Sequence, residues 1–161
     1  MVSVRILLLS CNTGEGHNST ARALMEVLEA RGIQCQLRDV LACQSPRLSK
    51  FISNWHVRIY KYSPKLFDVG YRAMERRTPD PEDTSVIYEL LRFSAGRLLE
   101  LLAEGDYDAV ICTHVFSGMV MTEVRRAFRM RIPSFFVATD YTCYPTTEQC
   151  DLDGYLFLMK P

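Results

Sequence analysis

Cys11–Leu24 reads C-N-T-G-E-G-H-N-S-T-A-R-A-L, and this stretch decides which fold we expect. The apolar residues Val4 and Ile6–Leu9 precede it and apolar residues at helical spacing follow it, so the stretch joins a buried strand to a helix. Gly14 and Gly16 let a ligand approach the backbone closely, and the first turn of a helix offers unpaired N–H groups. The stretch is therefore a candidate anion-binding loop of an α/β protein. The residues expected to cap the helix are Asn18, Ser19 and Thr20.

The rest of the chain continues the pattern of a Rossmann-like, doubly wound sheet. The first helix should end at Arg31–Gly32, with the glycine as its stop signal. The later apolar runs are mostly continuous, which is typical of parallel strands buried on both faces. At 161 residues, the chain is expected to form one domain over residues 1–161. We expect further strands at Ile33–Val40, Val110–Cys112, Ser134–Ala138 and Gly154–Leu158, and further helices at Ser85–Ala103 and Gly118–Arg131.

Composition excludes several classes of protein. An apolar fraction of 48% and a charged fraction of 24% match a globular chain and not a disordered one, and the formal charge of zero gives no global attraction to nucleic acid. The six cysteines form no C-x-x-C pair, which favours a reduced cytoplasmic setting, with Cys35 and Cys112 as small core residues. No apolar stretch approaches the roughly 20 residues of a spanning helix, so membrane contact is expected to be peripheral. Cys143, Cys150 and His114 have poor spacing for zinc, and we expect neither a metal nor a cofactor.

Residues 46–77 carry eight basic side chains against two acidic ones, interleaved with aromatic residues. Such a composition suits an anchor on an anionic bilayer, because basic groups are attracted to the surface and aromatic rings settle at the headgroup level. The alternative is a pair of core-packing helices, separated at Pro64, whose solvated face is basic. The candidate membrane contacts are Trp55, Arg58, Lys61, Phe67 and Arg72.

The glycine-rich loop matches a dinucleotide-binding fingerprint only in part. The pattern G-x-G-x-x-G requires glycine where Ser19 stands, although Asp39 lies about where a ribose-binding acid would. A P-loop is excluded because no Gly-Lys-Ser/Thr follows the turn. Nucleotide binding through Gly14, Gly16 and Asp39 therefore stays open as one alternative, and a turn without ligand as another.

His17 is the residue of the loop that a turn does not require. An imidazole at the ligand-facing end of a helix can remove a proton from an acceptor hydroxyl, or it can simply cap the loop. The pairs Thr113–His114 and Thr139–Asp140 follow predicted parallel strands, so they should lie along the same carboxyl edge of the sheet. Asp140 is a candidate to orient His17 or to bind a hydroxyl, and Tyr141 to wall the crevice; helix capping is the alternative for both pairs.

Three stretches together resemble the N-terminal domain of the monogalactosyldiacylglycerol synthase and processive diacylglycerol glucosyltransferase family. They are Ser10–Leu24, Cys112–Gly118 (C-T-H-V-F-S-G) and Thr139–Tyr155 (T-D-Y-T-C-Y-P-T-T-E-Q-C-D-L-D-G-Y). The resemblance implies a GT-B glycosyltransferase, in which two Rossmann-like domains face a cleft. It further implies that the N-terminal domain binds the lipid acceptor and the membrane, while the C-terminal domain binds the UDP-sugar.

The resemblance also implies roles for single residues. His17 matches the family histidine that acts as base, Gly14 and Gly16 match the loop glycines, and Asp140 matches the acid of the T-D-Y-T segment. Glu15 stands where many relatives have a third glycine, and Val115 where relatives have proline. The acceptor-binding residues expected on this basis are Gly14, Glu15, Gly16, Asn18, Thr113, His114 and Tyr141.

The resemblance thus makes residues 1–161 the acceptor-binding half of an inverting lipid glycosyltransferase. We expect it on the inner face of the cell membrane, acting on diacylglycerol or a related lipid with a UDP-hexose donor. No second Rossmann domain lies within these residues, so we expect no sugar transfer by them alone. The alternatives are a nucleotide-binding module and a non-catalytic peripheral membrane-binding domain.

Overall fold

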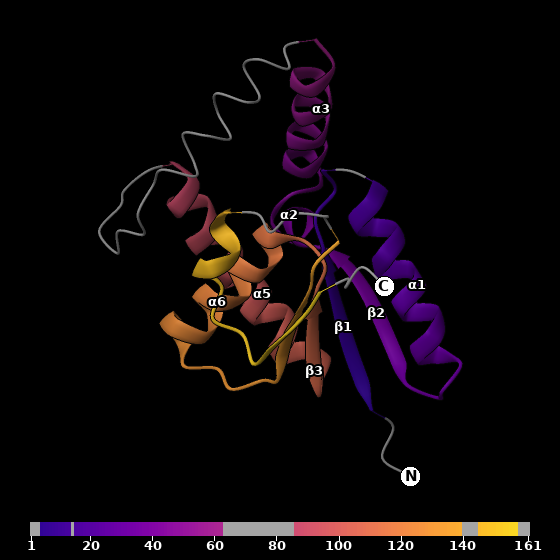
Figure 1. Ribbon diagram of the computed structural model, residues 1–161. Coiled ribbons are helices and arrows are strands. Elements are labelled where there is room, and N and C mark those ends of the chain that lie inside the picture. Colours follow the sequence, from indigo (N-terminus) through magenta and orange to yellow (C-terminus); the bar gives the residue numbers. More distant parts are fainter. Residues whose placement is uncertain (1–3, 14, 63–85, 140–144, 158–161) are drawn as a thin grey trace.

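Five parallel strands form the central sheet of the described part of the chain, in the order β2-β1-β3-β4-β5. The structure, a computed structural model, describes residues 4–13, 15–62, 86–139 and 145–157 (Figure 1). The Rossmann-like α/β fold is thereby confirmed. The strands are β1 (Arg5–Ser10), β2 (Gln34–Asp39), β3 (Ala109–Cys112), β4 (Ser134–Val137) and β5 (Gly154–Leu156).

Helices cover both faces of this sheet. The helix α1 packs on β1 and β2, whereas α5 and α6 pack against each other on the opposite side of the sheet (Figure 1). This arrangement follows from the strand order. The right-handed crossover from β1 to β2 runs in one direction along the sheet, whereas the crossovers from β2 to β3 and from β3 to β4 run in the other, so their helices lie on opposite faces. The helices are α1 (Glu15–Glu29), α2 (Val40–Gln44), α3 (Pro46–Tyr62), α5 (Val86–Gly105) and α6 (Val115–Phe128), with a 3-10 turn η1 (Pro145–Gln149).

The core is centred on β1, which is buried on both faces. Leu7, Leu8 and Leu9 are all fully buried, although neighbouring residues of a strand point to opposite sides. This burial accounts for the continuous apolar run in the sequence. Cys112 is buried in β3 as predicted, and burial raises the pKa of its thiol to about 12. The prediction for Cys35 was wrong, because β2 borders the described sheet and leaves this side chain partly exposed.

Helix boundaries differ from the predicted ones where side chains cap the helices. Val40 belongs to α2 and not to the strand, because the Asp39 carboxylate accepts a hydrogen bond from Leu41 N–H at 3.0 Å and so starts a helix. The predicted helix Gly118–Arg131 begins three residues earlier, since His114 is its N-cap. It ends at Phe128, where Arg129 adopts a left-handed backbone conformation with φ 53°.

Asp153 joins β4, β5 and α6 at the amino end of the strands. Its carboxylate accepts a hydrogen bond from Ser134 N–H at 2.8 Å and two from the Arg125 guanidinium at 3.0 Å each. The Ser134 N–H first, and then the Arg125 guanidinium, hold the pKa of Asp153 below its usual range. The negative form of Asp153 is therefore the one that stabilises this end of the sheet.

Several predictions fall outside the described residues. They concern Gly14, the helix after Pro64 with Phe67 and Arg72, and the segment with Asp140, Tyr141 and Cys143. Trp55 lies in α3, but its side chain is outside the description. Among the helices of the described ranges, none is long and apolar enough to cross a bilayer.

Candidate functional site

His17 lies at the carboxyl edge of the sheet, where the ends of three strands meet. It belongs to the first turn of α1, directly after the loop that leaves β1. Its Nδ1 is 3.0 Å from the main-chain oxygen of Thr113, which follows β3, and 2.5 Å from Oγ1 of Thr139, which follows β4. Residues more than 90 positions apart in the chain thus converge on one imidazole, as their positions after parallel strands predicted.

The contact with Thr113 identifies which ring nitrogen of His17 carries the proton. A carbonyl oxygen only accepts, so its hydrogen bond requires a proton on Nδ1. In the neutral ring the lone pair is then on Nε2. Within the described residues no hydrogen bond reaches Nε2 of His17, and the side chain is half-buried. The ring is therefore anchored through one nitrogen while the other is able to accept a proton.

His114 lies beside His17 and is held in the opposite way. Its Nδ1 accepts a hydrogen bond from Phe116 N–H at 3.0 Å, so this nitrogen carries no proton, and its Nε2 lies 2.9 Å from Thr13 Oγ1. The two imidazoles meet edge to face, with centroids 4.4 Å apart and planes at 80°. His114 thus caps α6 and supports the ring of His17, which agrees with the capping alternative. Thr113 contributes its carbonyl, because its own side chain is fully buried.

The glycine loop and the first turns of α1 form the rim of the site. Asn18 accepts a hydrogen bond from Ser10 Oγ at 2.7 Å, which ties α1 to the end of β1. Glu15 pairs with Arg22 at 2.8 Å, and both side chains are more than half exposed. Gly16 is exposed, and a methyl group added there would meet no atom within 4 Å. The open backbone at Gly16 is consistent with the close approach of a ligand.

The predicted helix caps were wrong, because α1 begins at Glu15 and not after Asn18. Ser19 and Thr20 already lie inside the helix, where their hydroxyls donate to the carbonyl of Gly16 at 2.9 and 3.1 Å. Such bonds to the preceding turn are usual for hydroxyl side chains within a helix. His17 is consequently part of the helix itself, so the helical backbone fixes the position from which its side chain extends.

Asp39 uses both carboxylate oxygens for contacts within the protein. One oxygen caps α2, and the other accepts a hydrogen bond from Ser49 Oγ of α3. Ser49 is buried at this junction. The carboxylate that a ribose would need is therefore engaged in holding α2 and α3 on the sheet.

Comparison with known proteins identifies the family. Residues 17–160 match the family described as monogalactosyldiacylglycerol (MGDG) synthase, which covers most of the chain. The chain belongs to the MGDG synthase family. The matched residues of this chain run from His17 in α1 through β5.

Curated relatives are longer than this chain. It is 23% identical over 156 residues to processive diacylglycerol β-glucosyltransferases of Bacillus mycoides (strain KBAB4) and Bacillus cereus (strain B4264), covering 94% of this chain and 38% of each relative. It is 25% identical over 134 residues to the uncharacterized glycosyltransferase YkoN of Bacillus subtilis (strain 168), covering 83% and 34%. The chain therefore spans little more than a third of these relatives. No solved structure is significantly similar to it.

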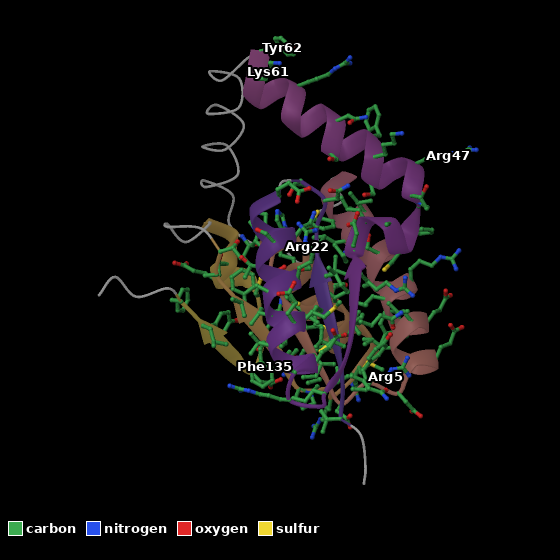
Figure 2. The ribbon with its side chains drawn as sticks, turned by 90° about the vertical axis from the view of Figure 1, so that its right-hand side faces the viewer. Arg5, Arg22, Arg47, Lys61, Tyr62 and Phe135 are labelled. Carbon is green, nitrogen blue, oxygen red and sulfur yellow. The ribbon has the colours of Figure 1, made fainter. Side chains whose placement is uncertain are left out.

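In this member of the MGDG synthase family, α3 extends from the carboxyl end of the sheet. Figure 2 shows Arg47 near one end of α3 and Lys61 and Tyr62 near the other. Both views show α3 extending beyond the sheet, and it packs against the short helix α2 (Figures 1 and 2). The exposed basic and aromatic side chains described on α3 are Arg47, Lys50, Phe51, Arg58, Lys61 and Tyr62.

Two contacts of the candidate site were missed in the sequence analysis of this MGDG synthase family member. Thr139 was recognised as a residue after β4, but the orienting role was given to its neighbour Asp140, which lies outside the described residues. The contact of Thr13 with His114 could not be predicted, because nothing in the sequence distinguishes Thr13 from the other polar residues of the loop. In the ranges that the structure describes, no group of three or more histidine, cysteine or acidic residues is arranged to hold a metal.

Proposed function

We propose that the chain is the acceptor-binding part of an inverting glycosyltransferase, one that moves a hexose from a UDP-sugar to diacylglycerol or a related membrane lipid. The observation that carries the proposal is the imidazole of His17, anchored through Nδ1 with Nε2 able to accept a proton. Membership of the MGDG synthase family and the activity for which the Bacillus relatives are named support the class of reaction.

His17 acts as the general base in this proposal. Its Nε2 removes the proton from the acceptor hydroxyl while the hydroxyl oxygen bonds to the anomeric carbon of the sugar. The bond from that carbon to the phosphate of UDP breaks on the opposite face, UDP leaves, and the anomeric configuration inverts. A positioned general base contributes typically about 10²–10⁴ in rate.

The rim of the site positions the acceptor in this proposal. The open backbone at Gly16 admits the glycerol part of the lipid, and Asn18 and His114 border it from α1 and α6. Because Glu15 adds a carboxylate at this rim, a neutral headgroup is favoured over an anionic one. The remaining residues assigned to the acceptor site are Gly14, Thr113 and Tyr141. Asp140 is the second proposed catalytic residue, which orients His17 or binds the acceptor hydroxyl.

α3 supplies the membrane contact in this proposal. It exposes basic and aromatic side chains and extends from the same edge of the sheet that holds His17 (Figure 2). Basic residues near an anionic surface contribute about 1 kcal/mol each. The proposed contact residues are Arg58 and Lys61 on the described helix, together with Trp55, Phe67 and Arg72. The domain would act at the cytoplasmic face of the membrane.

The donor site is proposed to lie outside these residues. More than half of the length of these relatives lies outside the matched region, and in a GT-B enzyme the second Rossmann-like domain binds the UDP-sugar. The nucleotide-binding alternative is disfavoured by the two internal contacts of Asp39. Tight calorimetric binding of a dinucleotide that is lost in Asp39→Ala would instead support that alternative.

A chimera tests the proposed activity. The chain is joined to the part of the Bacillus mycoides relative that follows the matched region, and labelled hexose transfer from UDP-glucose or UDP-galactose into diacylglycerol in vesicles is measured. We expect a glycolipid product, and the same chimera with His56→Ala, a substitution in α3, is the matched control for His17→Ala. A folded chimera that binds the UDP-sugar but forms no lipid product with any neutral glycerolipid would contradict the proposal.

A further inference from the structure

The three polar contacts around Nδ1 of His17 fit only one placement of the ring proton. If Nδ1 carries the proton, it donates to Thr139 Oγ1 at 2.5 Å and to the Thr113 carbonyl at 3.0 Å. The Thr139 hydroxyl can then donate its own proton to the Thr113 carbonyl oxygen, which is 3.4 Å away. All donors meet acceptors in this arrangement, so it needs no rearrangement when the ring takes up a second proton on Nε2.

Placing the ring proton of His17 on Nε2 instead of Nδ1 makes one contact repulsive. With the proton on Nε2, the Thr139 hydroxyl donates to the bare Nδ1, but the lone pair of Nδ1 then faces the Thr113 carbonyl oxygen at 3.0 Å. Two acceptors facing each other at this distance in a half-buried site are unfavourable. Since the free imidazole of histidine prefers its proton on Nε2, the site must supply the opposite preference.

We propose that Thr139 is a positioning residue for His17: its hydroxyl, with the Thr113 carbonyl, holds the imidazole in the tautomer that leaves the lone pair on Nε2. This inference rests on the proposed function, in which Nε2 accepts the proton of the acceptor. The two neighbouring histidines, His17 and His114, are thereby held in different tautomers and have different roles. His114 is held in the other tautomer, because its Nδ1 accepts from Phe116 N–H.

Among the described residues, the groups that contact Nδ1 of His17 are uncharged. A carbonyl and a hydroxyl are neutral acceptors, so they fix the direction of the ring without adding a charge beside it. Thr139 reaches His17 across 122 positions of sequence because both follow parallel strands of one sheet. The Thr139 side chain is half-buried, which limits the access of water that would compete for Nδ1.

Nitrogen chemical shifts of the histidine rings test the proposal on the 161-residue chain without substrate. Two-bond proton–nitrogen correlation spectra of protein with ¹⁵N-labelled histidine distinguish the two neutral tautomers at high pH. Single histidine-to-glutamine substitutions assign the signals of His17, His56 and His114. We expect His17 with its proton on Nδ1 and His114 with its proton on Nε2.

The variant Thr139→Val removes the hydroxyl while keeping the shape of the side chain. In the Nδ1–H form the hydroxyl makes two hydrogen bonds, to Nδ1 and to the Thr113 carbonyl, whereas in the Nε2–H form it makes one, to Nδ1. The net loss in Thr139→Val is therefore one hydrogen bond of the Nδ1–H form, which should move the tautomer ratio of His17 by up to about fivefold toward the Nε2–H form. Thr139→Ser should keep the wild-type ratio. The matched control Thr13→Val removes the hydroxyl that contacts His114, so it should alter the signals of His114 and not those of His17.

Two results would overturn the proposal: a wild-type His17 with its proton mainly on Nε2, or an unchanged ratio in Thr139→Val while the signals of His114 show an intact fold. In the chimera, Thr139→Val should lower kcat with little change in the KM for diacylglycerol, and Thr139→Ser should restore kcat. If Thr139→Val shifts the tautomer ratio of His17 but His17→Ala keeps full turnover, the proposed function is wrong, whereas the role of Thr139 in positioning the His17 ring is supported. If His17→Ala loses turnover but Thr139→Val leaves the ratio unchanged, only the positioning role fails.

Discussion

Gly118 lies at the contact between the stretches Cys112–Gly118 and Thr139–Tyr155. Replacing Gly118 tests how tightly these two stretches pack against each other. Gly118 is buried in α6, and a methyl group added to it would be 2.9 Å from Sγ of Cys150, just after η1. The next contacts would be Phe136 Cδ2 at 3.5 Å and Cys150 Cβ at 3.7 Å, which are ordinary van der Waals distances. The steric conflict in Gly118→Ala therefore comes from a single sulfur atom.

The expected magnitude combines two opposing terms. Overpacking a core typically costs about 1–3 kcal/mol, while glycine to alanine within a helix gains about 1 kcal/mol. We therefore expect Gly118→Ala to lower the free energy of unfolding by roughly 0–2 kcal/mol. In the Cys150→Ala background the sulfur is gone, and the same substitution should raise the free energy of unfolding by up to about 1 kcal/mol.

Urea denaturation followed by circular dichroism measures this difference as a double-mutant cycle. The four proteins are the wild type, Gly118→Ala, Cys150→Ala and the double variant, and the coupling energy should be about 1–3 kcal/mol. Equal effects of Gly118→Ala in both backgrounds would refute the reasoning, because the conflict would then not involve the sulfur of Cys150. A coupling of the expected size would show that Gly118 is in direct contact with Cys150 in the folded protein.

Three further predictions concern other parts of the molecule. Gly16→Ala should keep or raise the free energy of unfolding, by up to about 1 kcal/mol, yet lower transfer in the chimera, because the new methyl group is free of the protein but blocks the acceptor. Asp153→Asn should lower the urea midpoint at pH 7. Because the pKa of Asp153 is lower in the folded protein than in the unfolded chain, the difference in urea midpoint between the variant and the wild type should decrease as the pH falls below about 4. Arg58→Gln with Lys61→Gln should weaken sedimentation with anionic vesicles by about 30-fold, equivalent to about 2 kcal/mol, and leave neutral vesicles unaffected; equal losses with both vesicle types would contradict an electrostatic contact.

The strands and long helices could be predicted along the chain because their apolar residues form recognisable patterns. Ile6–Leu9 is an uninterrupted apolar run, and β1 is indeed buried on both faces. The short helix α2 could not be predicted, because five residues show no helical period and the cap of Asp39 is visible only in space. The early start of α6 was missed because a histidine, His114, takes the capping position.

The place of the candidate site could be predicted, but its internal contacts could not. His17, Thr113 and Thr139 were expected at one sheet edge, because the carboxyl ends of parallel strands meet there. Which side chain reaches the ring depends on the register of β3 and β4 against β1, and sequence patterns leave that register open. The burial of Cys35 failed for a related reason, since a pattern of residues does not say which strand lies at the border of the sheet.

Turnover of the chimera carrying His17→Ala tests the central claim most directly. The measurement is the rate of hexose transfer from the UDP-sugar to diacylglycerol at saturating donor, compared with the unsubstituted chimera and with His56→Ala. We expect a fall in kcat of about 10²–10⁴ for His17→Ala with little change in KM, and normal turnover for His56→Ala. A His17→Ala chimera that transfers sugar at the unsubstituted rate would contradict the assignment of His17 as the base.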